Sequence, residues 1–222
     1  MPLNRTVSAS ALALVAALAP SLAGGASLPP VKNPEALAPR GMNIEYRLDV
    51  DLDGDGDKDV AMIAVKGVVP APEQLTSTDG DGNRVLVIAA KDADGYRLAG
   101  FGKHAVQCRR CGGAFWGVVP AGVQVAYVRG AFVVTQQAGS RELVTWTHRY
   151  RIEPGRGAGN VRLIGVDRKL EDRTQGGVVT VSRNLLTGRT ITTVKGTVDN
   201  PPKPGTVKGA PSVVFLEAVR LT

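Results

Sequence analysis

Apolar and polar residues alternate along much of this chain with the period of two that is typical of half-buried β-strands. The stretch 143–152 (LVTWTHRYRI) shows it most clearly, with one face carrying valine, tryptophan, histidine, tyrosine and isoleucine and the other carrying threonine and arginine. The stretch 60–65 (VAMIAV) is instead continuously apolar, which predicts a strand buried on both faces. By these criteria strands are predicted over residues 43–50, 60–65, 84–91, 96–100, 123–128, 131–137, 143–152, 161–166, 178–183, 190–194 and 213–219.

No stretch after the first residues has the period of an amphipathic helix, and Gly, Pro, Asn and Asp cluster between the strands, as turns require. Residues 199–211 (DNPPKPGTVKGAP) are predicted to be a long loop. The sequence therefore predicts an all-β fold. We expect one antiparallel β-domain of roughly ten strands over residues 43–222, built as a sandwich, an open barrel or a meander.

The N-terminal 26 residues have the organisation of a secretory signal peptide. Arg5 supplies a positive start, residues 11–22 (ALALVAALAPSL) form an apolar segment, and small residues follow. We expect cleavage between Ala23 and Ser27, a flexible lead-in over residues 27–42, and export to the periplasm or the cell exterior. After removal of this leader, no apolar run is long enough to predict a membrane-spanning helix.

Between the first two predicted strands, residues 51–59 (DLDGDGDKD) place aspartates on alternate positions. So many carboxylates in one short loop repel one another unless a cation lies among them, and Ca²⁺ accepts the six to eight oxygen ligands that such a loop offers. A solvated acidic turn without metal is the alternative. The predicted metal ligands are Asp51, Asp53, Asp55, Asp57 and Asp59.

The spacing matches the first half of an EF-hand loop, with Gly56 at the position of the turn glycine. It departs from an EF-hand at position twelve, where Met62 replaces the bidentate glutamate, and in having strands instead of helices on both sides. Asp59 is therefore expected to close the site, with Asp57 contributing its backbone carbonyl.

The segment DLDGDGDKDV followed by an apolar strand resembles the calcium loop of FG-GAP and VCBS repeats, which occur in propellers and in many secreted bacterial proteins. The resemblance implies side-chain ligands at Asp51, Asp53, Asp55 and Asp59 and a main-chain oxygen at Asp57. Only one good copy is present, so a complete propeller of about four or more blades is not expected. The runs LIGVDR, RNLLTGR and CRRCGG resemble small secreted bacterial proteins that have one such repeat and no assigned activity.

Cys108 and Cys111 form the motif CRRC, and an exported protein favours a small-loop disulfide between them. A redox site remains an alternative, although the helical setting of a thioredoxin-like motif is missing. A zinc site is a further alternative, in which His104 and His148 would complete four ligands.

The chain contains 27 Lys and Arg against 20 Asp and Glu, for a net charge of +7. These cations are scattered, and together with the expected export they argue against nucleic-acid binding and make cell-envelope or surface components the expected partners.

With two histidines, no nucleophile motif and no phosphate-binding glycine loop, no catalytic residue is predicted. The leading hypothesis is an exported Ca²⁺-binding domain with a structural or recognition role. A cell-envelope hydrolase that acts on polysaccharide through carboxylates is the enzymatic alternative.

Overall fold

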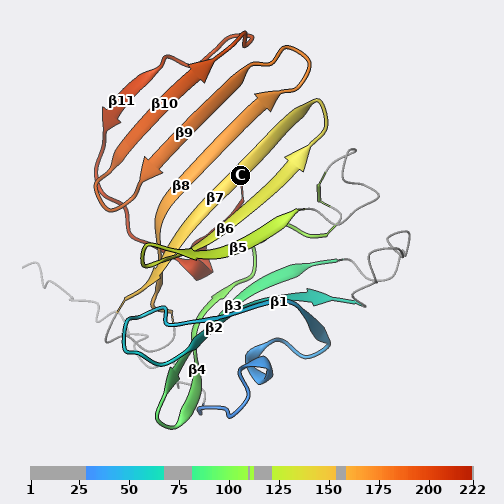
Figure 1. Cartoon of the computed structure of the whole chain (residues 1–222), viewed down its shortest axis with the longest axis vertical. Coiled ribbons are helices and arrows are strands. Elements are labelled where there is room, and N and C mark those ends of the chain that lie inside the picture. The colour runs from blue at the N-terminus through green and yellow to red at the C-terminus, as the bar shows by residue number, and fades with distance from the viewer. Residues whose placement is uncertain (1–28, 68–81, 110, 113–121, 154–158, 222) are drawn as a thin grey trace, which may run out of the picture.

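The computed structural model describes residues 29–67, 82–109, 111–112, 122–153 and 159–221 (Figure 1). These residues form two antiparallel sheets of four and eight strands, and the predicted all-β, antiparallel fold is confirmed. The sheets pack against each other as in a sandwich and do not close into a barrel. In the described residues no helix is both long and apolar enough to cross a membrane.

The first sheet is a meander in which each strand pairs with the next one along the chain. Its order is β1 (Met42–Val50), β2 (Asp59–Lys66), β3 (Arg84–Asp92) and β4 (Gly95–Gly102). Strand β2 is buried at every position from Asp59 to Val65, as its continuous apolar run predicts. One of its faces lies in the core between the sheets, and the other belongs to a smaller cluster packed by Leu37 of the 3₁₀ helix η1 (Pro34–Leu37).

The second sheet is a longer meander whose strands also follow sequence order, with one short strand added from the end of the chain. Strand β12 pairs with β8. The members are β5 (Val123–Val128), β6 (Ala131–Gly139), β7 (Glu142–Ile152), β8 (Val161–Asp172), β9 (Val178–Asn184), β10 (Arg189–Lys195), β11 (Gly205–Lys208) and β12 (Val214–Phe215).

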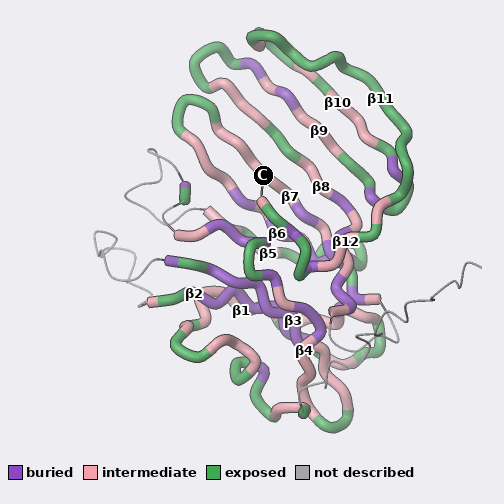
Figure 2. Tube along the Cα trace, turned by 180° about the vertical axis from the view of Figure 1, so that it is seen from behind, coloured by how far each residue is buried: buried purple, intermediate pink, exposed green. Residues whose placement is uncertain are grey.

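The second sheet is amphipathic along its length. The register aligns Tyr150, His148 and Trp146 of β7 with Phe132, Val134 and Gln136 of β6 on one face. Threonines and arginines occupy the other face, as the alternation of residues 143–152 predicts. The first sheet covers the apolar face at β6, β7 and the start of β8, and burial decreases from there through β9 and β10 to β11 (Figure 2).

The C-terminal segment seals the core between the two sheets. Strand β12 and the following 3₁₀ helix η4 (Leu216–Ala218) place Leu216 in the core, where its exposed fraction is 0%. Its side chain occupies a notch above β4 that exists because Gly100 and Gly102 lack a Cβ atom, which at Gly102 would lie 2.7 Å from Leu216 Cδ1. The two sheets are further joined by a 3.0 Å hydrogen bond from the Tyr46 hydroxyl of β1 to the Val125 carbonyl of β5.

Two segments differ from the sequence-based expectation. Residues 199–211, predicted as a loop, contain β11, whose four residues are all exposed and so carry no alternation of apolar residues to reveal the strand. Residues 213–219, predicted as one strand, divide into β12 and η4. In the lead-in, Val31 exchanges two backbone hydrogen bonds with Tyr96. The predicted signal peptide lies outside the described residues.

Candidate metal site in the β1–β2 loop

The aspartate loop connects β1 to β2 and closes the first hairpin of the molecule. Val50 and Asp59 are the last pair of the β1–β2 ladder, so residues 51–58 form the loop. Gly54 and Gly56 have φ angles of 88° and 93°, a left-handed conformation that costs glycine little. Leu52, with 5% of its surface exposed, points into the core between the sheets and anchors the loop there.

Three of the five predicted ligands converge in this loop. One carboxylate oxygen from each of Asp51, Asp53 and Asp59 lies within 4.8 Å of the others. Oxygens on opposite sides of a Ca²⁺ ion, each about 2.4 Å from it, are separated by about 4.8 Å. The three side chains are therefore spaced so that they can hold a metal ion, and the identity of that ion stays a prediction.

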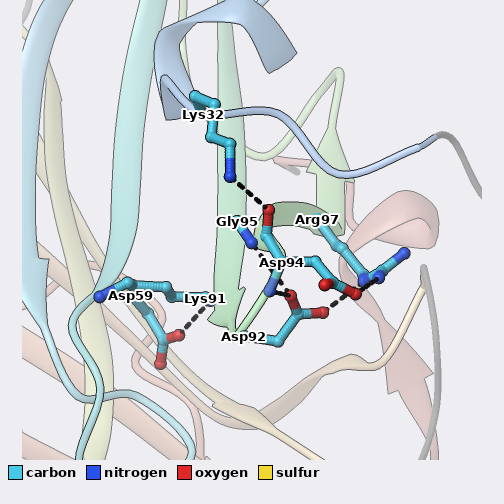
Figure 3. A network of polar contacts seen from close by, with 7 residues as sticks. All are labelled: Lys32, Asp59, Lys91, Asp92, Asp94, Gly95 and Arg97. Carbon is cyan, nitrogen blue, oxygen red and sulfur yellow. Dashed lines mark hydrogen bonds and ion pairs between the residues drawn. The ribbon is translucent and has the colours of Figure 1, made fainter.

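Asp59 is the buried member of this group, with an exposed fraction of 0%. Its carboxylate accepts a hydrogen bond from the backbone N–H of Leu52 at 2.7 Å. It accepts a second from the backbone N–H of Lys91 at 2.8 Å (Figure 3). Burial raises the pKa of this carboxyl above its ordinary value, although the two N–H groups oppose the change by stabilising the anion. Asp59 thus ties the loop to β3 and presents a desolvated carboxylate to the cluster.

On the exposed side of the loop, aspartate side chains accept hydrogen bonds from nearby backbone groups and so form tight turns. Asp51 accepts from the N–H groups of Gly54 at 2.6 Å and Gly56 at 3.1 Å, and Asp53 accepts from that of Asp55 at 3.2 Å. The pKa of Asp53 is raised, mainly by desolvation and further by the neighbouring charges of Asp55 and Asp51. These turns hold the carboxylates close together despite their mutual repulsion.

The remaining two predicted ligands lie outside the three-residue group. Asp55 accepts a hydrogen bond from the N–H of Asp57 at 2.8 Å. The Asp57 carboxylate lies 3.5 Å from the Lys91 ammonium group, in a partly exposed ion pair. The participation of Asp55 and of the Asp57 carbonyl in metal binding therefore stays a prediction.

A second acidic turn lies beside this loop, between β3 and β4, and it is arranged differently. Asp92 accepts from the N–H groups of Asp94 at 2.9 Å and Gly95 at 3.2 Å, and it pairs with Arg97 (Figure 3). The Arg97 guanidinium is the main reason that the pKa of Asp92 lies below its ordinary value. A protein cation thus lies beside Asp92, whereas the cation of the β1–β2 loop, Lys91, pairs with Asp57, which is outside the group of three.

The Lys91 contact to Asp59 could not be found from sequence, because 32 positions separate the two residues. The contact depends on the pairing of β2 with β3, in which Val60 lies opposite Ala89. The alternating aspartates were the only local signal of the site, and they do not distinguish the buried carboxylate from the exposed ones.

Cys108 and Cys111 form a disulfide with an S–S distance of 2.02 Å, as predicted. Because each sulfur is bonded to the other, neither is free to bind zinc as a thiolate, and the structure does not support the zinc alternative. His148 lies on β7 with 4% of its surface exposed and stacks against Tyr150 in the core.

Comparisons of the chain with models of protein families, with curated proteins and with solved structures found no match. The resemblance of the aspartate loop to FG-GAP and VCBS repeats therefore stays a prediction from its residues.

Proposed function

We propose that this protein is an exported Ca²⁺-binding β-domain, with a structural or recognition role, in which the ion closes the β1–β2 loop. The observation that carries the proposal is the convergence of Asp51, Asp53 and Asp59 oxygens within 4.8 Å. The ion would join the end of β1 to the start of β2. Through the hydrogen bond from the Lys91 N–H to Asp59, it would also stiffen the connection to β3.

The chemistry of the donors favours calcium over other common metals. The three converging groups are carboxylates, which are hard oxygen ligands suited to Ca²⁺, Mg²⁺ or Mn²⁺, whereas zinc prefers His and Cys. Mg²⁺ requires near-ideal octahedral geometry at 2.0–2.1 Å, whereas Ca²⁺ accepts the irregular arrangements of a flexible loop. The Asp55 carboxylate and the Asp57 carbonyl are the nearby protein oxygens that would raise the ligand number toward Ca²⁺'s preference.

The electrostatics of the loop support the same proposal. Two carboxylates separated by 4.8 Å repel each other by roughly 3 kcal/mol at an effective dielectric constant of about 20. Burial is the main cause of the raised pKa of Asp53 and of Asp59, and the charges of neighbouring carboxylates add to it. A bound divalent ion would reverse the effect, because it stabilises the charged form of each carboxylate.

Export is the second part of the proposal and is supported by two observations. Residues 1–26 have the composition of a signal peptide, and the Cys108–Cys111 disulfide is compatible with an oxidising compartment. Outside the cell, calcium sites with dissociation constants of about 10⁻⁴ to 10⁻³ M can be occupied.

The proposal is tested by calorimetric titration and thermal unfolding of the chelator-treated protein with CaCl₂ or MgCl₂. At a Ca²⁺ concentration 100 times the Kd, the folded state gains about 2.7 kcal/mol, which raises the Tm of a chain of this size by about 5–10 °C. The variant Asp53→Asn should lose most of this gain, because it removes one of the three charges while preserving the side chain's shape.

Asp94→Asn is the matched control, since Asp94 lies in the neighbouring acidic turn, where it pairs with Arg97. It should bind calcium as the unmodified protein does. The absence of binding heat and of a Tm increase at 10 mM CaCl₂ would refute the proposal. Equal responses to calcium and magnesium would refute the assignment of the ion.

A further inference from the structure

A cleft of about 640 Å³ lies at the end of the β1–β2 hairpin opposite the aspartate loop. Met42 at the start of β1 and Lys66 at the end of β2 line one side of it, next to the first residues of β3. Ala138 of β6, Trp146 of β7 and Leu221 of the C-terminal segment line another side. The cleft thus lies where the two sheets and the C-terminal segment meet, and its volume is in the range of small-molecule sites.

The charged residues that line this cleft are all basic. They are Lys66, Arg84, Lys103 and Arg220, with His104 beside them, and the described part of the lining contains no aspartate or glutamate. The hydrolase alternative, which requires two facing carboxylates, therefore finds no support in the described walls of this cleft.

Two of these cations are available to a ligand. Arg84 is bound in bidentate fashion by Glu45, at 2.5 and 2.7 Å, so its charge is already compensated. Lys103 and Arg220 are exposed, and neither forms an ion pair with any residue that the structure describes. Arg220 donates from one Nη atom to the carbonyls of Glu217 and Val219, which orients its guanidinium and leaves other N–H groups for an anion.

The cleft also offers apolar surface next to these cations. Ala138 and Leu221 contribute aliphatic groups, and Trp146 contributes an indole ring, a kind of side chain that contacts apolar ligands over a large area. Cys108 and Cys111, which are joined by a disulfide, line the same cleft. A ligand that combines a negative head with an apolar body matches both kinds of surface.

The hairpin separates this basic cleft from the acidic loop. Strand β2 runs from Asp59 in the metal cluster to Lys66 in the cleft. Its eight residues span about 23 Å at roughly 3.3 Å per residue, which exceeds the screening length of about 8 Å at physiological salt. The aspartates therefore do not neutralise the cleft, and its affinity for an anion does not depend on calcium.

We propose that this cleft binds a small amphipathic anion, with its phosphate or carboxylate head at Lys103 and Arg220 and its apolar body against Trp146 and Leu221. The site is separate from the metal loop. It gives the protein a recognition function that neither the sequence nor the calcium proposal assigns.

Calorimetric titration with octyl phosphate below its micelle concentration tests this proposal, with EDTA present so that the metal site stays empty. We expect saturable binding of one octyl phosphate per chain. Inorganic phosphate lacks the apolar body and 1-octanol lacks the charge, and each should bind at least tenfold more weakly. Equal affinity for octyl phosphate and 1-octanol, or the absence of saturable binding, would overturn the proposal. Octanoate in place of octyl phosphate then distinguishes a preference for a carboxylate head from one for a phosphate head.

Charge-reversal variants locate the site. The double variant Lys103→Glu with Arg220→Glu should weaken octyl phosphate binding by roughly tenfold or more, since charge-assisted hydrogen bonds are among the strongest in such sites. Arg189→Glu with Lys195→Glu makes the same change in net charge on exposed positions of β10 and should leave the affinity within about twofold.

Equal losses in the two double variants would show that only the overall charge matters and would refute the site. If the charge-reversed variant does not fold, Lys103→Gln with Arg220→Gln removes the same two positive charges without adding negative ones. It should still weaken octyl phosphate binding roughly fivefold. Unchanged affinity in that variant would contradict the proposal.

Discussion

Protonation of His148 should weaken the fold between pH 7 and pH 5. Burial on β7 lowers the pKa of this histidine from 6.5 to about 4, and the charge of Asp167 opposes the effect only in part. Its Nδ1 atom has no hydrogen-bond partner among the described residues, and its ring stacks on Tyr150 at a centroid distance of 6.3 Å. The folded state therefore favours the neutral imidazole.

The sign and size of the change in the free energy of unfolding follow from the difference between the pKa of His148 in the unfolded chain and in the folded chain. Because the folded pKa is depressed, the stabilisation is complete above about pH 6.5 and is lost as the pH falls toward 4. At pH 5 the unfolded chain is almost fully protonated at this residue while the folded chain is not. The free energy of unfolding should therefore be about 2 kcal/mol lower at pH 5 than at pH 7 through this residue alone.

The buried carboxyl of Asp59 acts in the opposite direction. The raised pKa of Asp59 means that its contribution increases as the pH falls toward its folded pKa, so the total pH dependence mixes both effects. The variant His148→Phe isolates the histidine, because Asp59 is unchanged in it and its contribution cancels in the comparison.

Urea unfolding followed by circular dichroism, at pH 7 and pH 5 with EDTA present, measures the free energies of both proteins. The decrease from pH 7 to pH 5 should be about 2 kcal/mol larger in the unmodified protein than in His148→Phe. A difference below about 0.5 kcal/mol between the two decreases would refute the argument that desolvation keeps this imidazole neutral in the folded protein.

Two further predictions concern the core and its rim. Glu45→Gln should destabilise the protein by about 2 kcal/mol in urea unfolding, because Arg84, only 4% exposed, keeps its charge while its bidentate partner becomes neutral. Glu171→Gln, which alters an exposed pair, should cause no measurable change, and equal effects would contradict the argument. Gly102→Ala should lower the free energy of unfolding by about 1–3 kcal/mol, because the added methyl group would lie 2.7 Å from Leu216 Cδ1; unchanged stability would show that the notch can widen freely.

The strands could be predicted from the sequence wherever burial imposes a pattern. Strand β7 has one buried face and alternates, and β2 has two buried faces and is continuously apolar, so both were found within one residue of their observed ends. Strand β11 has no buried face. Its backbone pairs with β10, and backbone pairing does not require particular residue types, so the sequence gives no sign of the strand. Periodicity reports burial, and it detects a strand only where the strand is buried.

The two candidate sites also differ in how far the sequence could predict them. The aspartate loop consists of nine consecutive residues, so its pattern can be recognised in the sequence. The three carboxylates that converge are among the five predicted ligands. The basic cleft draws Lys66, Lys103, Trp146 and Arg220 from distant parts of the chain. No spacing rule links these residues, because the packing of two sheets and the path of the C-terminal segment bring them together.

The path of that segment has a consequence for how the chain folds. All other strands pair with a neighbour in sequence, so both meanders can form hairpin by hairpin at a low cost in loop closure. Strand β12 pairs with β8, about fifty residues earlier, and only then does Leu216 enter its notch on β4. Residues 214–218 are synthesised after all the strands that they seal. The apolar faces of the two sheets therefore stay open until these residues have been synthesised.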